Sequence, residues 1–186
     1  MNVIMISGSR NPEGQTARAA DAVLKGLTTA GASVERVFLP VLNIERCRQC
    51  DDNGWGLCRR AGECVIEDDF AGLVEKIRQA DVVVFANPVY YGDLSESLRA
   101  FTDRLRRICS QDAGRMGIRG KRAIGVCVAG GGGGGALECC VSLKRVLSTC
   151  GFDVVDMMPV RRQNLHAKLP RLEMLGKWLA QVLAEE

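Results

Sequence analysis

Five short apolar runs alternate with amphipathic stretches along this chain. Three of the runs are rich in Val and Ile and nearly continuous in apolar character, which is typical of parallel strands covered on both faces. The run at 34–39 alternates more and is expected at an edge of the sheet. We therefore predict five strands, at residues 3–7, 34–39, 81–87, 122–129 and 152–158.

Helical patterns separate these runs and follow the last one. In each pattern apolar residues recur at spacings of three and four, so that one face of the helix is apolar. Asp68 and Asp69 suit the start of the second helix, and Asp93 with Glu96 predicts a capping box for the third. The fifth helix is expected to follow Pro170. The five apolar faces begin at Ala20, Phe70, Leu94, Cys140 and Leu172.

The alternation of strands and helices predicts a three-layer α/β fold with one parallel sheet and right-handed crossovers. At 186 residues the chain is expected to form a single domain, residues 1–186. The one long segment without periodicity is residues 40–67, between the second strand and the second helix. We interpret it as an insertion, and loops of this length are usually functional or disordered.

Composition narrows the classes of function. The formal net charge is only +3 and aromatic residues make up 5%, so the sequence lacks both the charge and the stacking surface of a nucleic-acid binder. The first residues show neither a basic targeting segment nor a cleavage signal, and no apolar run approaches the length of a membrane span. We expect a cytoplasmic protein with no membrane or nucleic-acid partner.

Nine cysteines are many for one chain. In a reducing compartment most are expected to be free thiols or metal ligands rather than disulfides. Five of them fall within predicted helices and a strand, where we expect them to pack in the core as small apolar side chains. These five are Cys109, Cys127, Cys139, Cys140 and Cys150.

Three loops follow strands whose carboxyl ends should meet at one edge of the sheet, where ligands bind in open α/β folds. The first loop, residues 7–16, opens a helix and is suited to cradling a phosphate, although a plain polar turn would read the same way. Its hydroxyls, glycines and one arginine are Ser7, Gly8, Ser9, Arg10, Gly14 and Thr16.

The second loop, residues 87–95, starts with Asn87, which Pro88 holds extended. Tyr90, Tyr91 and Gly92 then project at the sheet edge and are suited to form a wall for a planar ring. Alternatively, the two tyrosines cover the core or meet a partner subunit.

The third loop is a run of six glycines, residues 130–135, between the fourth strand and its helix. Glycines there let the backbone approach a flat ligand closely. Gly130, Gly132 and Gly135 also satisfy the dinucleotide-binding pattern, with Asp153 or Asp156 as the ribose-binding acid. Six consecutive glycines match that pattern trivially, so it is weak evidence.

The segments "GSRNPEGQT" and "NPVYYGDLSESLRAFTDRL" and the glycine run resemble the flavodoxin-like NADPH-dependent FMN reductases. The cysteine-rich insertion ending in "CVIEDDF" is similar to that of the subgroup that includes the iron-sulfur flavoproteins. The resemblance covers most of residues 1–150 and implies a sheet of order 2-1-3-4-5, FMN bound at its edge, and homodimers or homotetramers.

The resemblance also assigns roles to residues of the three loops. Ser9, Arg10, Gln15 and Thr16 would hold the phosphate of FMN. The segment Pro88, Val89, Tyr90, Tyr91 and Gly92 would line the isoalloxazine ring. Gly130, Gly131, Gly132 and Gly133 would lie at the other edge of that ring.

The insertion carries four cysteines in the spacing C-x2-C-x7-C-x5-C: Cys47, Cys50, Cys58 and Cys64. The first C-x2-C is a good chelating pair, and all-thiolate ligation suits an iron–sulfur cluster or zinc. The family's cluster pattern is more compact between the second and third cysteines. A [4Fe–4S] cluster, zinc and unliganded thiols are thus all open, and we expect the sulfurs near the flavin of this chain or of a neighbouring subunit.

The leading hypothesis is an FMN-dependent oxidoreductase that takes electrons from NAD(P)H and passes them to a quinone, flavin, metal ion or protein. The alternatives are an iron-sulfur electron carrier with a ferredoxin-like partner and no nicotinamide reaction, and a zinc-stapled module without catalysis. The basic stretch 104–122 is either a docking surface for an acidic partner or the NADPH 2′-phosphate, or a solvated helix face. We name no acid–base catalyst, and expect His166 at the surface and Tyr90, Tyr91 and Trp55 in a subunit contact.

Overall fold

A computed structural model describes residues 1–185. Its sheet has five parallel strands in the order β2-β1-β3-β4-β5, as the resemblance implied. The strands are β1 (Asn2–Ser7), β2 (Ser33–Phe38), β3 (Val82–Pro88), β4 (Arg122–Ala129) and β5 (Asp153–Arg161). The helices are α1 (Gln15–Thr28), α2 (Leu57–Arg60), α3 (Asp69–Gln79), α4 (Glu96–Ile108), α5 (Asp112–Arg115), α6 (Ala136–Cys150) and α7 (Leu165–Glu185), with short 3-10 turns η1 (Leu39–Val41) and η2 (Arg162–Asn164).

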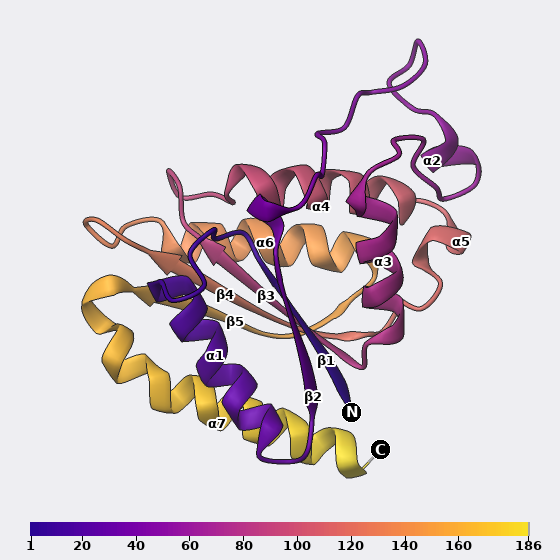
Figure 1. The fold of residues 1–186 in the computed structure, drawn as a ribbon. Coiled ribbons are helices and arrows are strands. Elements are labelled where there is room, and N and C mark those ends of the chain that lie inside the picture. The colour runs from indigo at the N-terminus through magenta and orange to yellow at the C-terminus, as the bar shows by residue number, and fades with distance from the viewer. Residues whose placement is uncertain (186) are drawn as a thin grey trace.

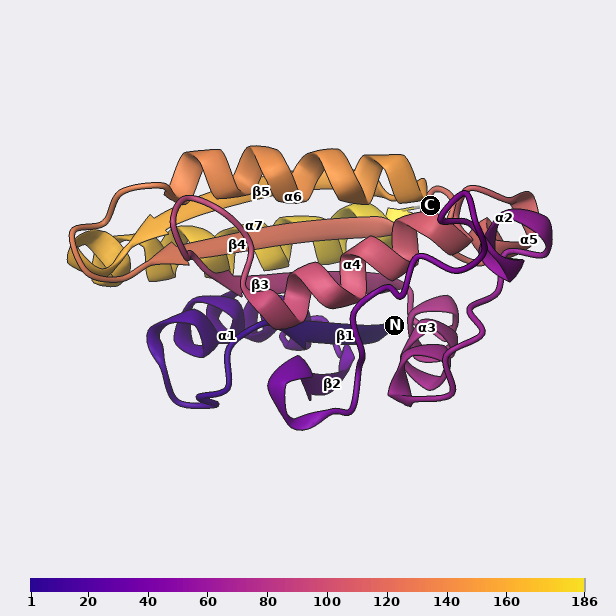
Figure 2. The same ribbon diagram turned by 90° about the horizontal axis from the view of Figure 1, so that it is seen from above.

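Helices cover both faces of the sheet, which makes the fold a flavodoxin-like three-layer sandwich (Figures 1 and 2). Side chains of each strand alternate between two cores. One core packs the strands against α3, α4 and α6, and the other packs them against α1 and α7. All five cysteines predicted to pack in the core are buried on the α3–α4–α6 side.

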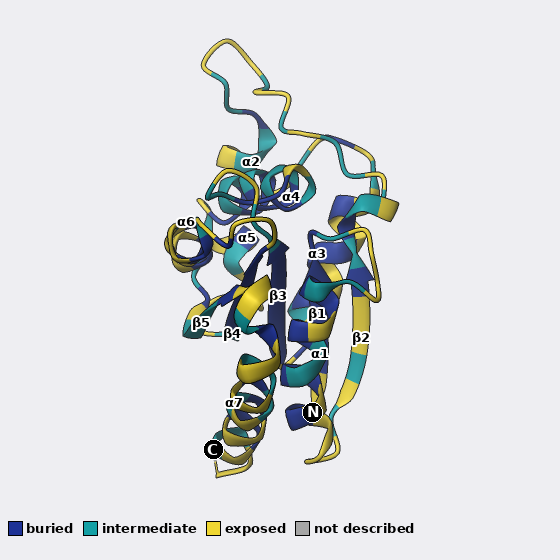
Figure 3. Cartoon of the chain, turned by 90° about the vertical axis from the view of Figure 1, so that its left-hand side faces the viewer, coloured by how far each residue is buried: buried dark blue, intermediate teal, exposed yellow. Residues whose placement is uncertain are grey.

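The central strands of the sheet are more deeply buried than the edge strands (Figure 3). The apolar strands β1, β3 and β4 are almost wholly buried, as continuous apolar runs predict. Strand β2, whose sequence alternates, lies at the edge and is largely exposed. None of the helices within residues 1–185 has both the length and the apolar character that crossing a membrane requires.

Helix starts match the sequence in one case and differ in two. Helix α3 begins as predicted, with the Asp68 carboxylate accepting from the Phe70 N–H at 3.1 Å. The capping box predicted for α4 is wrong, because Ser95 is the N-cap and its hydroxyl accepts from the backbone N–H of the first turn. Helix α7 was predicted to follow Pro170 but begins five residues earlier, at Leu165. Leu165 is buried and extends the apolar face of the helix, and Pro170 inside the helix removes only one backbone hydrogen bond.

Candidate functional site

The three loops after β1, β3 and β4 meet at one edge of the sheet, as predicted. Backbone hydrogen bonds join their bases, from Gly8 N–H to the Ala86 carbonyl at 2.8 Å and from Val89 N–H to the Val128 carbonyl at 3.0 Å. Together the loops form a cleft of about 670 Å³, within the size range of small-molecule sites. The predicted residues that line it are Ser9, Gly14, Gln15, Thr16, Pro88, Val89, Tyr90, Gly130, Gly131, Gly132 and Gly133.

The loop before α1 keeps backbone N–H groups available at the helix start. Gly14 is the N-cap of α1, and no side chain of residues 1–185 caps this end. Inside the loop, the Ser7 hydroxyl accepts from Ser9 N–H at 3.1 Å, and the Asn11 side chain accepts from Glu13 N–H at 2.9 Å. The uncapped amides of the first helical turn favour an anion such as a phosphate.

Six predicted residues do not line this cleft. Ser7 and Gly8 are buried, Arg10 is exposed, and Tyr91 is fully exposed with a φ of +51°. Asn87 is buried, and Gly92 lies against Gly135. Four residues that were not predicted also line the cleft: Asn11, Val128, Ala129 and Gly134. The signal that could have found them is their place within or beside the predicted loops.

Asn87 is the buried centre of the second loop. Its amide N–H donates to the Pro88 carbonyl at 2.8 Å and to the Cys139 sulfur at 3.2 Å. Its amide oxygen accepts from Ser95 N–H at 3.0 Å. One side chain thereby fixes the end of β3, the start of α4 and the first turn of α6, and so sets the wall of the cleft.

Gly135 brings the second and third loops into contact. It has a φ of +80°, and a Cβ there would lie 2.5 Å from the Gly92 Cα and 2.9 Å from the Gly92 nitrogen. Only a residue without a side chain allows this approach. Neither candidate acid of the dinucleotide pattern is among the residues that line the cleft: Asp153 begins β5 at the opposite end of the sheet and pairs with Arg122, and Asp156 lies within β5 opposite Ile124.

The four clustered cysteines share a second cavity with Arg104 and Arg107 of α4. All four are half-buried free thiols. Gly56 makes room for one of them, since a Cβ there would lie 2.8 Å from the Cβ of Cys50. In the part of the chain that the structure describes, no three potential ligands already sit around one point, so the sulfurs would have to converge on a metal. The donor types, the shared cavity and the space left by Gly56 fit an all-thiolate site.

The cysteine-rich insertion does not lie beside the cleft of its own chain, so that part of the prediction is wrong. It leaves η1, turns away from the sheet edge and packs on the C-terminal half of α4, whereas the second loop leads into the N-terminus of that helix (Figures 1 and 2). Helix α4 has 13 residues, about 20 Å of length. Trp55 is likewise not at the cleft, because its ring lies 4.4 Å from the Arg107 guanidinium and 5.7 Å from that of Arg59.

Most basic side chains of residues 104–122 have partners within the chain. This favours a packed and solvated helix and loop over a free docking surface. The partners are Asp68 for Arg104, Asp103 for Arg106, the Gly54 carbonyl for Arg107, Asp112 for Arg119, the Ala80 carbonyl for Lys121 and Asp153 for Arg122. His166 is exposed on α7, as predicted.

The sequence matches a model of a known protein family. The family model described as NADPH-dependent FMN reductase matches residues 1–167. The chain belongs to this family.

Two relatives connect this FMN reductase family member to the predicted subgroup. An iron-sulfur flavoprotein of Methanocaldococcus jannaschii is 31% identical over 131 residues, which cover 70% of this chain and 62% of the relative. Another from the same organism is 30% identical over 169 residues, which cover 91% of this chain and 79% of the relative. Against two further iron-sulfur flavoproteins the matched region spans 46% and 52% of the relative, so it covers only about half of their length.

Solved structures confirm the fold of this family member. The NAD(P)H:quinone oxidoreductase from Methanothermobacter marburgensis superposes with a TM-score of 0.68 at 22% identity, over 96% of each chain. A flavodoxin from the domain Archaea superposes with a TM-score of 0.63 at 14% identity, over 99% of this chain and 98% of the other.

Proposed function

We propose that this chain is an FMN-dependent NAD(P)H oxidoreductase that passes electrons to a small-molecule or protein acceptor. The observation that supports it is the cleft, where the uncapped start of α1, the loop with Tyr90 and the glycine loop meet. The match to the FMN reductase family agrees with it. When bound, the flavin would supply the hydride and electron chemistry, so the protein need only bind, orient and shield it.

Each loop has a separate task in this proposal. The α1 amides with Ser9, Gln15 and Thr16 hold the phosphate, and exposed Arg10 adds positive charge at the entrance. Pro88, Val89 and Tyr90 would cover one side of the isoalloxazine ring and exclude water from it. The backbone of Gly130–Gly133 lies against the other edge of the ring, where side chains would keep a flat group at a distance.

We further propose that Cys47, Cys50, Cys58 and Cys64 bind a [4Fe–4S] cluster, with zinc as the alternative. Thiolate ligands suit both. Sulfurs on a long loop can converge on a metal, because the cost of loop closure rises slowly with loop length.

Measurements of the flavin and of the metal test these proposals separately. Purified protein should be yellow and should release FMN on denaturation, and stopped-flow mixing with NADPH or NADH should bleach the flavin. Anaerobic protein should also contain about four irons per chain, with absorption near 400 nm that dithionite bleaches. A colourless protein that takes up no added FMN contradicts the flavin proposal, and the absence of both iron and zinc contradicts the metal site.

The second candidate is an electron carrier that exchanges electrons with a ferredoxin-like partner and never reacts with a nicotinamide. Four thiols in one cavity favour it, since they would give the chain a second redox centre. Flavin that neither NADH nor NADPH reduces, but a reduced ferredoxin does, would select this function.

Assembly of identical chains is part of the proposal. Tyr91 is fully exposed beside the cleft, and Leu137 is 64% exposed on the neighbouring α6. Large apolar side chains grouped on a surface often meet a partner. Light scattering of the flavin-bound protein should give a multiple of 20.2 kDa, and the mass of one chain would contradict a homo-oligomer.

A further inference from the structure

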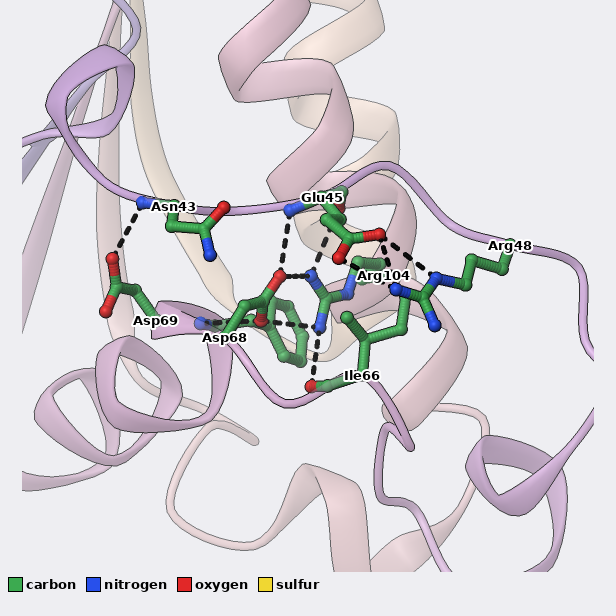
Figure 4. A network of polar contacts seen from close by, with 8 residues as sticks. Asn43, Glu45, Arg48, Ile66, Asp68, Asp69 and Arg104 are labelled. Carbon is green, nitrogen blue, oxygen red and sulfur yellow. Dashed lines mark hydrogen bonds and ion pairs between the residues drawn. The ribbon is translucent and has the colours of Figure 1, made fainter.

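Arg104 is a buried cation at the base of the cysteine-rich insertion (Figure 4). Its side chain is 1% exposed, and its partner Asp68 is 0% exposed. The two guanidinium Nη atoms donate to the two carboxylate oxygens, at 2.5 and 2.9 Å. The plane of the guanidinium also lies over the Phe70 ring, 4.2 Å from its centroid. The position of Arg104 is therefore fixed on several sides.

The same two Nη atoms also hold both ends of the insertion. They donate to the Glu45 carbonyl at 3.1 Å and to the Ile66 carbonyl at 3.4 Å. Asp68 reinforces the closure by accepting from Glu45 N–H at 2.8 Å. All four clustered cysteines lie between these two anchoring points.

The third nitrogen of the guanidinium, Nε, takes no part in these hydrogen bonds. Within residues 1–185, Arg104 Nε is buried and has no hydrogen-bond partner, as is also true of the Nε atoms of Arg78 and Arg115. An unpaired buried donor is costly, and binding of an acceptor is one way to satisfy it. The guanidinium interacts with the Cys64 side chain, and both residues line the cysteine cavity.

We infer that Arg104 is the positioning residue of the cysteine site, and that its free Nε–H donates to the sulfur of Cys64 when this cysteine is a metal-bound thiolate. A neutral thiol is a weak acceptor, whereas a thiolate is a strong one. The inference rests on the proposed metal site and identifies the group that orients its fourth sulfur.

The effect of Arg104 on a cluster would come from the hydrogen bond more than from its charge, because Asp68 neutralises the guanidinium. Hydrogen bonds to cluster sulfurs stabilise the more negative, reduced state and so raise the reduction potential. A Lys at this position would keep the charge, but its ammonium cannot pair bidentately with Asp68 and also present a fixed N–H to Cys64.

Arg107 provides a matched control. It lies one turn further along α4, lines the same cavity and anchors the same loop, through a 2.7 Å hydrogen bond to the Gly54 carbonyl and its contact with Trp55. Neither of these two side-chain interactions involves a cysteine sulfur. Arg107→Gln therefore loosens the loop without removing a donor to sulfur.

The experiment compares Arg104→Lys and Asp68→Asn/Arg104→Gln with Arg107→Gln and wild type. The double variant avoids leaving an unpaired buried carboxylate, which would threaten folding. In samples matched for iron content, anaerobic redox titration should show a roughly tenfold shift toward the oxidised cluster in both Arg104 variants, about 59 mV for a one-electron couple. Arg107→Gln should keep the wild-type potential.

Metal-free protein supplies an independent readout. Peptide mass spectrometry would follow iodoacetamide alkylation of Cys64 relative to Cys47 at fixed pH. The ratio should fall several-fold in the double variant, which lacks the N–H donor to the Cys64 sulfur, and should not change in Arg107→Gln.

The outcomes separate the two proposals. If wild-type protein takes up neither iron nor zinc, the metal site fails, while the alkylation ratio still decides whether Arg104 acts on Cys64. Folded Arg104 variants with an unchanged ratio and, where a cluster forms, an unchanged potential would overturn the inference. Arg104 would then only close the base of the loop.

Discussion

Gly135→Ala tests whether the contact between the second and third loops forms the cleft. The new methyl group would lie 2.5 Å from the Cα of Gly92, a backbone atom that cannot rotate away. The substitution would also place a side chain at a φ of +80°, in the left-handed region. Either the two loops separate or α6 begins differently, and both outcomes widen the cleft.

The expected cost is the sum of two contributions. The left-handed conformation costs about 1–2 kcal/mol for a residue with a Cβ. Inserting a methyl group into a filled contact costs about 1–3 kcal/mol. The free energy of unfolding should thus fall by about 2–5 kcal/mol, which for a domain of this size lowers the Tm by roughly 4–20 °C.

Gly134→Ala is the matched control. A Cβ at Gly134 meets no atom within 4 Å, and this residue is not among those with positive φ. It should keep the wild-type Tm, but because Gly134 lines the cleft its FMN affinity does not serve as a control. Calorimetry would measure the Tm, and quenching of flavin fluorescence would measure the Kd of Gly135→Ala, which should rise at least tenfold over wild type, about 1.4 kcal/mol. A Gly135→Ala protein with the Tm of Gly134→Ala and the wild-type Kd would refute the reasoning.

Three further predictions concern α4 and the insertion. Ser95→Ala should lower the free energy of unfolding by about 1 kcal/mol, because the N-cap of α4 is lost. Glu96→Ala should lower it by only about 0.3 kcal/mol. Equal losses for the two variants in urea denaturation would favour the capping box instead. Burial raises the pKa of Asp68, but hydrogen bonds from Arg104 and backbone N–H groups outweigh it and hold the pKa below 3.8. Its stabilising contribution is therefore complete above pH 3.8 and lost as the pH falls through the folded-state pKa. The double variant Asp68→Asn/Arg104→Gln, which leaves no unpaired buried charge, should flatten the stability–pH curve there, and a curve as steep as that of wild type would count against the ion pair. Cys58→Ser should reduce the iron per chain at least twofold while FMN content stays unchanged, and metal analysis that finds wild-type iron would remove Cys58 from the ligand set.

The layers of the fold could be predicted because their signals are local. Apolar runs and helical periodicity depend on neighbouring residues, and both periods appear clearly in this chain. Local sequence patterns do not identify the residue that caps α4. Asp93 and Ser95 are both good capping residues, and the choice depends on buried Asn87, which accepts a hydrogen bond from Ser95 N–H. That contact spans eight residues and belongs to the tertiary structure.

The cleft and the cysteine site differ in predictability for a related reason. Loops that follow adjacent parallel strands must meet at one edge, so Ser9, Pro88 and Gly130 could be grouped from the sequence alone. The direction of a long insertion follows no such rule. It is set by the pairing of Arg104 with Asp68, 36 residues apart, which no local pattern encodes.

The closure formed by Arg104 and Asp68 has a consequence for how this protein can vary. Arg104 joins the two ends of the insertion at Glu45 and Ile66, so the insertion leaves and re-enters the fold at the same place whatever its internal sequence. The segment between these two residues can therefore change in length or in its metal ligands without changing the cleft. The seven residues between Cys50 and Cys58 are an example of such freedom, and the same two junctions are where an engineer would graft a different redox centre.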